Sequence, residues 1–249
     1  MTNSDRRNLR RFCRKYVSPE SRLLDVGCGL GENLELLRAL GFNSLVGTDI
    51  SKEMVDRTRE KGFEAYTVDE LRYLNDKYDA ILFSHVIEHV GYPEIQSFLE
   101  TYLGLLESRE GYVIIITPVL YDAFYNDVDH IKPYYVDGLL RLFSTINVSQ
   151  QYESPFRFNL IDLRYRRQIA LPYNIRCRFI RTPLNLVKMK ILNALAAVAF
   201  FMSFGLFGKT SGYVAIFRVS CGNGEALLEK PSWLNTHSLQ MKITNPIDS

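Results

Sequence analysis

The strongest constraint on the fold is a turn with three alternating glycines, at residues 23–37, LLDVGCGLGENLELL. Before the turn, the apolar run that includes Leu23 and Leu24 is typical of a strand covered on both faces. After it, leucines recur at helical spacing as far as Gly41. Glycine adopts positive φ and has no Cβ, so a ligand can approach the main chain closely. The turn is therefore predicted to lie beneath a group the size of adenosine.

The glycine spacing separates two classes of nucleotide cofactor. The dinucleotide fingerprint G-x-G-x-x-G needs a small residue at position 32, where this sequence has Glu32. A nicotinamide dinucleotide is therefore disfavoured. An acid followed by G-x-G-x-G, here Asp25, Gly27, Gly29 and Gly31, resembles the first motif of the class I S-adenosylmethionine-dependent methyltransferases.

Later motifs continue the resemblance to this family. Residues 46–51, VGTDIS, resemble its second strand, whose final acid, Asp49, would accept hydrogen bonds from both ribose hydroxyls. A third strand at residues 64–68 precedes Asp69, where the family often places a side chain near the adenine amino group. Glu70 can serve equally well in that role.

A fourth strand at residues 78–84 runs into HVIEHV, residues 85–90. This element is similar to one in the ubiquinone-type and glycan-type methyltransferases. The resemblance implies S-adenosylmethionine as the cofactor. It also implies a set of cofactor-binding residues along the strand ends: Asp25, Gly27, Cys28, Gly29, Gly31, Asp49, Ile50, Asp69, Ser84 and His85.

Strands alternate with helices over roughly the first 130 residues, which predicts an α/β fold with a doubly wound parallel sheet. Ligands bind such sheets at the carboxyl ends of the strands. Further strands are predicted at residues 111–118, 146–152 and 212–219. The resemblance implies a Rossmann-like, seven-stranded sheet of order 3-2-1-4-5-7-6, with the seventh strand antiparallel.

Three regions are expected along the chain. Residues 1–153 and 211–222 form the methyltransferase domain, residues 154–210 form an insertion between the sixth and seventh strands, and residues 223–249 form an irregular tail. About sixty residues separate the last two predicted strands, far more than a hairpin loop uses. The insertion is therefore expected to have a purpose of its own.

The insertion combines a basic block with an apolar run. Between residues 154 and 190, Asp162 is the sole acid among nine basic residues: Arg157, Arg164, Arg166, Arg167, Arg176, Arg178, Arg181, Lys188 and Lys190. Residues 191–208 carry no charge, and a helix that is apolar all round must be buried in protein or in lipid. The run is slightly shorter than the roughly 20 residues that span a bilayer.

We therefore expect the insertion to enter one leaflet of a membrane, with its arginines on anionic headgroups. A buried helix of an enlarged core, or a dimer interface, is the alternative. Nucleic-acid binding is disfavoured, because the apolar run has no use in an RNA groove. The oligomeric state stays open.

Cysteine usage and the first residues bear on the compartment. The four cysteines form no C-x-x-C pair, so the sequence predicts neither a zinc knuckle nor a disulfide framework. Cys28 is interpreted as a packing residue. Basic residues at positions 6–15 lack the apolar core of a secretory signal and predict a surface helix that covers the sheet. The expected location is the cytoplasm, at the inner face of the membrane.

The cofactor implied by the resemblance carries an activated methyl group, so the protein mainly has to place the acceptor in line with it. A hydroxyl acceptor also loses a proton, for which imidazole, with an ordinary pKa of about 6.5, is suited. His89 and His130 are the candidate bases, with Glu88 and Asp129 beside them. Residues 127–135, DVDHIKPYY, resemble a segment that crosses the acceptor pocket of glycan-type relatives.

These features lead to the hypothesis of a methyltransferase for an amphiphilic or lipid-linked acceptor, such as a cell-surface glycan in assembly. A polyprenylated quinone precursor is the alternative acceptor. A catalytically inactive methyltransferase fold that serves as a membrane partner is a second alternative, which the intact glycine turn and Asp49 disfavour.

The histidines also match two known metal-binding patterns. His85, Glu88 and His89 match the inverted zinc-protease motif, but the motif begins where a strand ends, whereas the protease needs a long helix. With His130 they resemble the metal site of small-RNA 2′-O-methyltransferases, in which a Glu stands at the position of His85. The principal hypothesis uses no metal, and metal-assisted transfer stays open. For His85, a role in lining the cofactor pocket carries the same weight as a catalytic role. For His89, a structural role satisfied by hydrogen bonds likewise carries the same weight as a catalytic role.

Overall fold

The computed structural model describes residues 1–74, 76–107, 110–121, 123–143, 153–169, 183–204, 206 and 208–221. Its strands are β1 (Leu23–Val26), β2 (Leu45–Asp49), β3 (Glu64–Thr67), β4 (Ala80–Ser84), β5 (Glu110–Pro118), β6 (Phe156–Ile169) and β7 (Gly208–Cys221). Its helices are α1 (Asn3–Tyr16), α2 (Glu32–Arg38), α3 (Lys52–Glu60), α4 (Val68–Tyr73), α5 (Glu94–Leu103), α6 (Val136–Phe143) and α7 (Pro183–Met202). Two short 3-10 turns, η1 (Ile87–His89) and η2 (Phe124–Asn126), complete the described elements.

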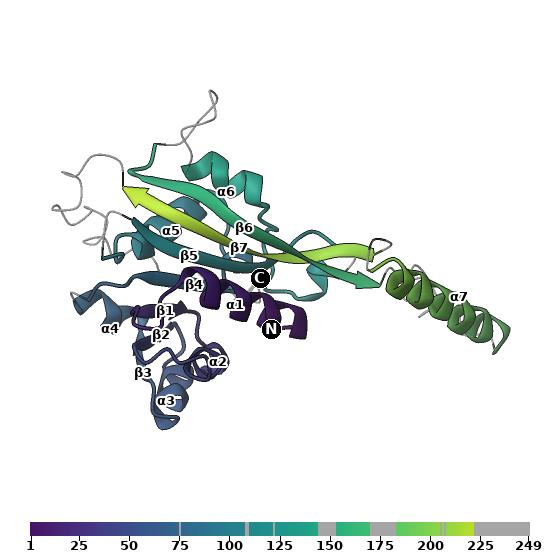
Figure 1. Ribbon diagram of the computed structural model, residues 1–249, viewed down its shortest axis with the longest axis horizontal. Helices are drawn as coiled ribbons and strands as arrows, with labels where there is room; N and C mark the ends of the chain where they lie inside the picture. The colour runs from purple at the N-terminus through teal and green to yellow at the C-terminus, as the bar shows by residue number, and fades with distance from the viewer. Residues whose placement is uncertain are drawn as a thin grey trace, which may run out of the picture.

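The strands form one sheet in the order β3-β2-β1-β4-β5-β7-β6 (Figure 1). The first five are parallel, and β7 is antiparallel to both of its neighbours. This arrangement confirms the Rossmann-like, seven-stranded α/β sheet expected from the sequence. The carboxyl ends of β1, β2, β4 and β5 consequently meet at one edge of the sheet.

Apolar residues on both faces of the sheet form the core. Every residue of β1 and of β4 is buried, because helices cover both sides of these central strands. One cluster packs α5 and α6 on the sheet, through residues such as Leu99 and Phe143. The other packs α1 and α2, through Phe12 and Leu37. As the sequence predicts, α1 covers the sheet and leaves basic residues such as Arg10 exposed.

The sixth strand lies later in the chain than the sequence predicts. The predicted strand, residues 146–152, falls outside the described residues, and β6 lies within residues 154–210, the range assigned to the insertion. The reason is that β6 is an edge strand paired only with β7, so it tolerates arginines that hide the alternating pattern. Only residues 170–207 therefore separate β6 from β7, and α7 is the helix that the structure describes among them.

The β6–β7 hairpin extends beyond the rest of the sheet. β7 pairs with β5 only as far as Pro118↔Gly212, whereas β6 and β7 stay paired as far as Ile169↔Gly208. The hairpin thus continues as a two-stranded ribbon past the carboxyl end of β5, and α7 projects from it, away from the body of the protein (Figure 1). Among the described residues, no helix combines the length and the apolar character needed to cross a bilayer.

Candidate functional site

The glycine turn joins β1 to α2 and has the backbone conformation that glycine favours. Gly27, Gly29 and Gly31 have φ values of 70°, 51° and 75°. A Cβ on Gly27 would collide with the side chain of Val86, whereas a Cβ on Gly29 would meet no atom within 4 Å. Gly27 therefore allows the segment after β4 to pack closely on the turn. Gly29 faces open space in which a ligand can lie against the main chain.

Asp49 ends β2 beside this turn. Its Oδ2 atom accepts a hydrogen bond from the backbone N–H of Gly29 at 2.9 Å, and its Oδ1 atom accepts one from Ser51 at 2.9 Å. Each carboxylate oxygen can accept a second bond, so Asp49 retains acceptor positions for two ligand hydroxyls. Ile50 is 73% exposed next to it and offers an apolar surface. The Ser51 side chain caps α3 by accepting a hydrogen bond from the backbone N–H of Met54.

Asp25 lies buried beneath the turn. Its Oδ1 atom accepts a hydrogen bond from Asn33 Nδ2 at 3.3 Å, and its Oδ2 atom has no partner among the described residues. Burial raises the pKa of Asp25 to about 7, the hydrogen bond from Asn33 opposes this rise, and the charge of Asp49 adds to it. A cationic or hydrogen-bond-donating ligand on the turn would therefore favour the ionised form of Asp25.

Cys28, inside the turn, has the surroundings of a packing residue. Its side chain is 5% exposed, and a Cβ on Gly47 of β2 would lie 2.8 Å from its sulfur. Burial raises the pKa of the Cys28 thiol to about 12, so the thiol is neutral and a poor nucleophile.

The segment after β4 connects the turn to the candidate acceptor side. Ser84 is buried, and His85 has φ of 58°, which is uncommon for a residue other than glycine. His85 Nδ1 lies 3.1 Å from Glu88 Oε1, and its Nε2 lies 3.7 Å from Asp5 Oδ2. Burial lowers the pKa of His85, but the two neighbouring carboxylates outweigh burial and raise the pKa above its ordinary value.

Asp5 and Arg166 form a buried ion pair next to His85. Arg166 of β6 is 5% exposed and donates to Asp5 of α1 at 2.5 Å and to the Ser211 side chain at 3.1 Å. Burial alone would raise the pKa of Asp5, but the nearby His85 imidazole, 3.7 Å away, and the charge of Arg166 lower it to about 2. The interpretation of Arg166 as one of the headgroup-binding arginines is therefore wrong, because its guanidinium neutralises a carboxylate in the interior.

The candidate acceptor side gathers Glu88, His89 and His130. The imidazole rings of His89 and His130 have centroids 5.0 Å apart, although 40 residues separate them. One ligand atom from each of the three residues lies within 4.8 Å of the others. The backbone N–H of Ile131 donates to the Glu88 carbonyl at 2.9 Å, which holds the segment around His130 against η1. Glu88 is fully buried, and its Oε2 accepts a hydrogen bond from Thr117 of β5 at 3.0 Å.

Asp69 stands apart from these residues. It lies in the first turn of α4, its side chain is 86% exposed, and it pairs with Arg72 at 3.3 Å. Its role near the adenine stays a prediction.

Asp5 and Thr117 were not among the functional residues predicted from the sequence. The capping pattern Thr2-x-x-Asp5 was the available signal, but it explains the start of a helix and not the contact with His85.

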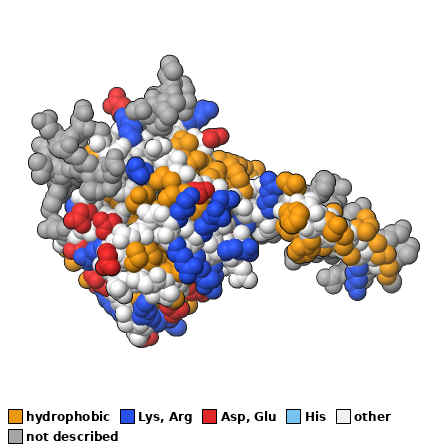
Figure 2. All heavy atoms as spheres, viewed as in Figure 1, with side chains coloured by type: hydrophobic (Ala, Val, Ile, Leu, Met, Phe, Trp, Pro, Cys, Tyr) orange, Lys and Arg blue, Asp and Glu red, His pale blue; other side chains and the backbone are white. Residues whose placement is uncertain are grey.

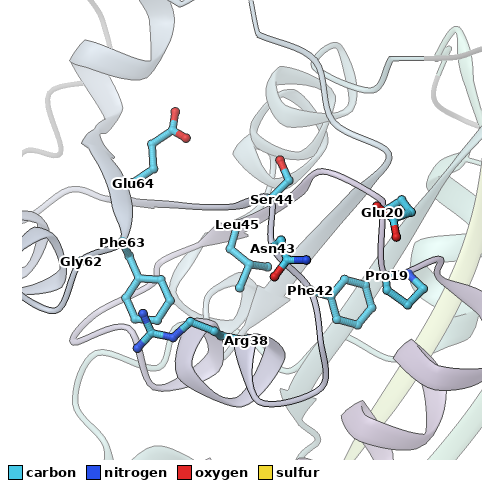
Figure 3. A pocket seen from close by; sticks show the side chains of 10 residues that line it. All are labelled: Pro19, Glu20, Arg38, Phe42, Asn43, Ser44, Leu45, Gly62, Phe63 and Glu64. Atoms are coloured by element: carbon cyan, nitrogen blue, oxygen red, sulfur yellow. The ribbon is translucent and has the colours of Figure 1, made fainter.

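A hollow near the start of β2 and β3 is distinct from this edge. Leu45 and Glu64, the first residues of these strands, line it together with Arg38 and Phe63 (Figure 3). The Arg38 guanidinium lies 4.0 Å from the centroid of the Phe63 ring. The hollow is therefore at the amino ends of the parallel strands, away from the glycine turn.

Comparison with known proteins assigns the chain to a family. A profile described as a methyltransferase domain matches residues 4–170. The chain belongs to the methyltransferase domain family. Its fold is that of the class I enzymes, and its cofactor is S-adenosylmethionine. This confirms the resemblance seen in the glycine turn and in the strand ends.

Solved structures agree with the methyltransferase fold. An S-adenosylmethionine-dependent methyltransferase from Archaeoglobus fulgidus is 23% identical, with a TM-score of 0.53, over 86% of this chain and 94% of that one. The YcgJ protein of Bacillus subtilis is 15% identical, with a TM-score of 0.54, over 89% of this chain and 100% of that one.

A curated relative matches a shorter part of the methyltransferase. The carboxy-S-adenosyl-L-methionine synthase of Trichodesmium erythraeum (strain IMS101) is 29% identical over 106 residues, which cover 38% of this chain and 42% of that protein. The chain thus spans less than half the length of this relative.

The turn and its neighbours fit S-adenosylmethionine. The open space at Gly29, the remaining acceptor positions of Asp49 and the unpartnered oxygen of Asp25 match a ligand with an adenosine part and positive charge. These residues, with Ile50, would hold the cofactor, which supplies an activated methyl group when bound.

Replacing Gly29 by alanine tests this assignment. At φ of 51° an alanine costs about 1 kcal/mol of stability, and its methyl group would enter the open space above the turn. Gly41→Ala is a matched control, because Gly41 has φ of 97°, also has no neighbour within 4 Å and follows α2 at the end opposite to the turn. Both variants should lose similar stability. In calorimetry, only Gly29→Ala should weaken S-adenosylmethionine binding, by about tenfold or more; equal affinities would contradict the assignment.

Proposed function

We propose that the methyltransferase transfers a methyl group to a hydroxyl of an amphiphilic acceptor at a membrane surface, such as a lipid-linked cell-surface glycan. The observation that carries this proposal is α7, an apolar helix that projects from the body of the protein at the end of the β6–β7 ribbon (Figure 1). The preference for a glycan rests on the resemblance of residues 127–135 to the acceptor segment of glycan-type relatives.

The surface of α7 favours contact with lipid. Apolar side chains on several faces of the helix are 40–78% exposed: Val187, Ile191, Leu192, Leu195, Val198, Phe201 and Met202. Figure 2 displays this gathering of apolar side chains on the projecting part of the molecule. Transfer of each such side chain out of water is worth about 1.5–3 kcal/mol when burial is complete. A helix of this kind is more stable in the interfacial layer of a membrane than in water.

The position of α7 connects the membrane to the site. Because Gly212 of β7 pairs with Pro118 at the end of β5, the ribbon that bears α7 leaves the sheet at the carboxyl edge of the parallel strands. Thr117, one residue earlier in β5, contacts Glu88 at that same edge. An acceptor with its lipid tail in the membrane would therefore present its polar head close to Glu88, His89 and His130.

Basic residues on this projecting part favour anionic lipid. Lys190 is exposed on α7, and Arg167 and Lys209 lie in the part of the ribbon that extends beyond the carboxyl end of β5. A cation close to an anionic surface contributes about 1 kcal/mol. Since the cytoplasmic leaflet is the anionic one, we propose the inner face of the membrane as the location. Three further cations of the predicted block, Arg176, Arg178 and Arg181, lie outside the described residues.

Either histidine of the acceptor side can take the hydroxyl proton. His89 Nδ1 lies 3.0 Å from the carbonyl oxygen of Asp129, and His130 Nδ1 lies 2.8 Å from that of Phe124. A carbonyl oxygen only accepts hydrogen bonds, so each Nδ1 carries a hydrogen, and in the neutral ring each Nε2 carries a lone pair. A neutral imidazole with a free Nε2 is a competent general base.

Liposome flotation tests the membrane contact. The triple variant Ile191→Ser, Leu195→Ser, Val198→Ser should lose binding to vesicles that contain phosphatidylglycerol, because three exposed side chains on α7 no longer gain from lipid. The control replaces Tyr73, which is 87% exposed at the end of α4, by serine. We expect the control variant to float as the unsubstituted protein does. Equal flotation of the triple variant would refute it.

Labelling tests the acceptor. Membranes incubated with the protein and S-adenosylmethionine labelled in its methyl group should yield label in lipid-extractable glycan. Label in a prenylated phenol would identify a quinone precursor instead. No transfer to any membrane fraction by a protein that binds S-adenosylmethionine would favour an inactive methyltransferase fold.

A further inference from the structure

We propose that Glu88, His89 and His130 form a binding site for one divalent transition-metal ion of the zinc type. The binding site does not depend on which acceptor is methylated. It is carried by the geometry of the three side chains and by the partners that orient them.

The three side chains converge from two separate segments. Glu88 and His89 lie in η1, and His130 lies in the segment that docks on η1 through the hydrogen bond from Ile131 N to Glu88 O. Their ligand atoms lie within 4.8 Å of one another. Two ligands of one tetrahedral ion lie about 3.4 Å apart when each metal–ligand distance is about 2.0–2.2 Å. Small side-chain rotations therefore suffice to coordinate an ion.

Both imidazoles present the correct nitrogen. Each Nδ1 is engaged with a backbone carbonyl oxygen, of Asp129 for His89 and of Phe124 for His130. This is the outer hydrogen bond that metal-binding histidines usually make, since it fixes the tautomer and the ring orientation. Both Nε2 lone pairs are thereby left for a ligand, and His130 Nε2 lies 3.6 Å from Asp127 Oδ2, a second carboxylate beside the site.

Glu88 would place a buried negative charge next to the metal ion. Its carboxylate is fully buried, with His85 Nδ1 at 3.1 Å from one oxygen and Thr117 Oγ1 at 3.0 Å from the other. Each oxygen keeps a further lone pair, so coordination breaks neither contact. A buried carboxylate is costly unless cations and donors compensate it, and a metal ion would add to that compensation.

The donor set selects the class of metal. Two imidazole nitrogens with one carboxylate oxygen are typical of zinc sites that keep a fourth position open. Magnesium and calcium prefer oxygen ligands throughout, so two histidines disfavour them. Cobalt(II) takes the same ligands as zinc and absorbs visible light, which makes it a suitable probe.

The site would change how an acceptor hydroxyl loses its proton, a consequence that rests on the proposed function. An ion at this position would lower the pKa of a hydroxyl that reaches the open coordination position. The O–H bond would then break with release of the proton to solvent, and neither histidine would act as the base, because both Nε2 lone pairs would be coordinated.

Cobalt titration of the full chain tests the site directly. Chelator-treated protein, without S-adenosylmethionine or acceptor, should bind one equivalent of Co²⁺ and develop visible absorption. His89→Ala and His130→Ala should each weaken binding by about 100-fold or more, since loss of an outer partner alone typically costs 10–100-fold. The matched controls are His237→Ala, the fourth histidine of the sequence, and Glu107→Gln, an exposed carboxylate, and both should bind as the unsubstituted protein does.

The variant His130→Cys separates ligation from a structural role. A thiolate is itself a ligand of zinc and cobalt, so this variant should retain Co²⁺ and gain a thiolate-to-cobalt charge-transfer band. Thermal unfolding and S-adenosylmethionine calorimetry show whether each variant is folded. The proposal is overturned if the unsubstituted protein binds no Co²⁺ stoichiometrically, or if folded His89→Ala and His130→Ala bind it unchanged. Neither result affects the methyl-transfer assay, so failure of the metal site and failure of the proposed function remain distinguishable.

Discussion

Replacing Asp49 by alanine is expected to weaken S-adenosylmethionine binding by at least about 100-fold. A hydrogen bond to a charged acceptor contributes about 1.5–3 kcal/mol, and the proposed contact with the ribose contains two of them. The substitution also removes the carboxylate that accepts from the backbone N–H of Gly29 at 2.9 Å, so the turn itself loses support. Isothermal titration calorimetry measures the affinity directly.

Two further variants make the Asp49 result interpretable. Asp49→Asn keeps the size of the side chain and one oxygen acceptor, so its affinity should lie between those of the alanine variant and the unsubstituted protein. Asp56→Ala removes an exposed carboxylate of α3 that pairs with Lys52 at 2.6 Å, and it should leave binding unchanged. Retained affinity in Asp49→Ala would overturn the ribose assignment.

Replacing Arg166 by methionine is expected to lower the free energy of unfolding by about 3–5 kcal/mol. The substitution keeps most of the side-chain volume but leaves the fully buried carboxylate of Asp5 without its cation. Urea unfolding, followed by circular dichroism, gives the difference.

Neighbouring substitutions separate the ion pair from general effects on β6. Arg164→Met alters an arginine on the same strand that is 43% exposed, and it should cost less than about 1 kcal/mol. The double variant Asp5→Asn, Arg166→Met removes the buried charge and should be more stable than Arg166→Met alone. If Arg166→Met and Arg164→Met cost the same, the buried pair does not stabilise the fold.

Protonation of Asp5 at low pH is expected to lower the free energy of unfolding. Its pKa is lowered from an ordinary 3.8 to about 2 in the folded protein, so ionised Asp5 contributes about 2 kcal/mol above pH 4. This contribution disappears as the pH falls from about 4 through 2. Asp25 has the opposite sign, because its pKa is raised from an ordinary 3.8 to about 7, so its burial lowers stability as the pH rises from about 4 to 7 and costs no more above 7.

Most of the cofactor side could be predicted from the sequence, because its signals are local. The alternating glycines between β1 and α2 adopt positive φ as expected, and Asp49 lies at the end of β2, where it contacts Gly29. Apolar runs of strand length, separated by helical periods, were sufficient to predict the parallel strands and their order by resemblance. Each of these signals depends on residues close together in the chain.

The acceptor side could be predicted only in part. His89 and His130 were recognised as separate candidates, but their proximity depends on how residues 127–135 dock on η1 through the carbonyl of Glu88. Nothing in the spacing showed that Glu88 would be fully buried between His85 and Thr117. Asp69 was placed near the adenine only by resemblance to the family; its side chain is exposed and pairs with Arg72, and that role stays a prediction.

The sequence by itself determined the glycine turn, the carboxylate after β2 and the alternation of strands and helices, because backbone conformation and hydrophobic periodicity are encoded locally. Only the tertiary structure decided where β6 lies and what its arginines do. An edge strand tolerates charge on either face, so β6 and a lipid-binding block have the same composition. The pairing of Arg166 with Asp5 joins residues that are 161 positions apart in the chain, so no local pattern predicts it. The same long-range packing decided that the ribbon bearing α7 extends beyond the carboxyl edge of the sheet, since the antiparallel register of β7 with β5 directs the hairpin there.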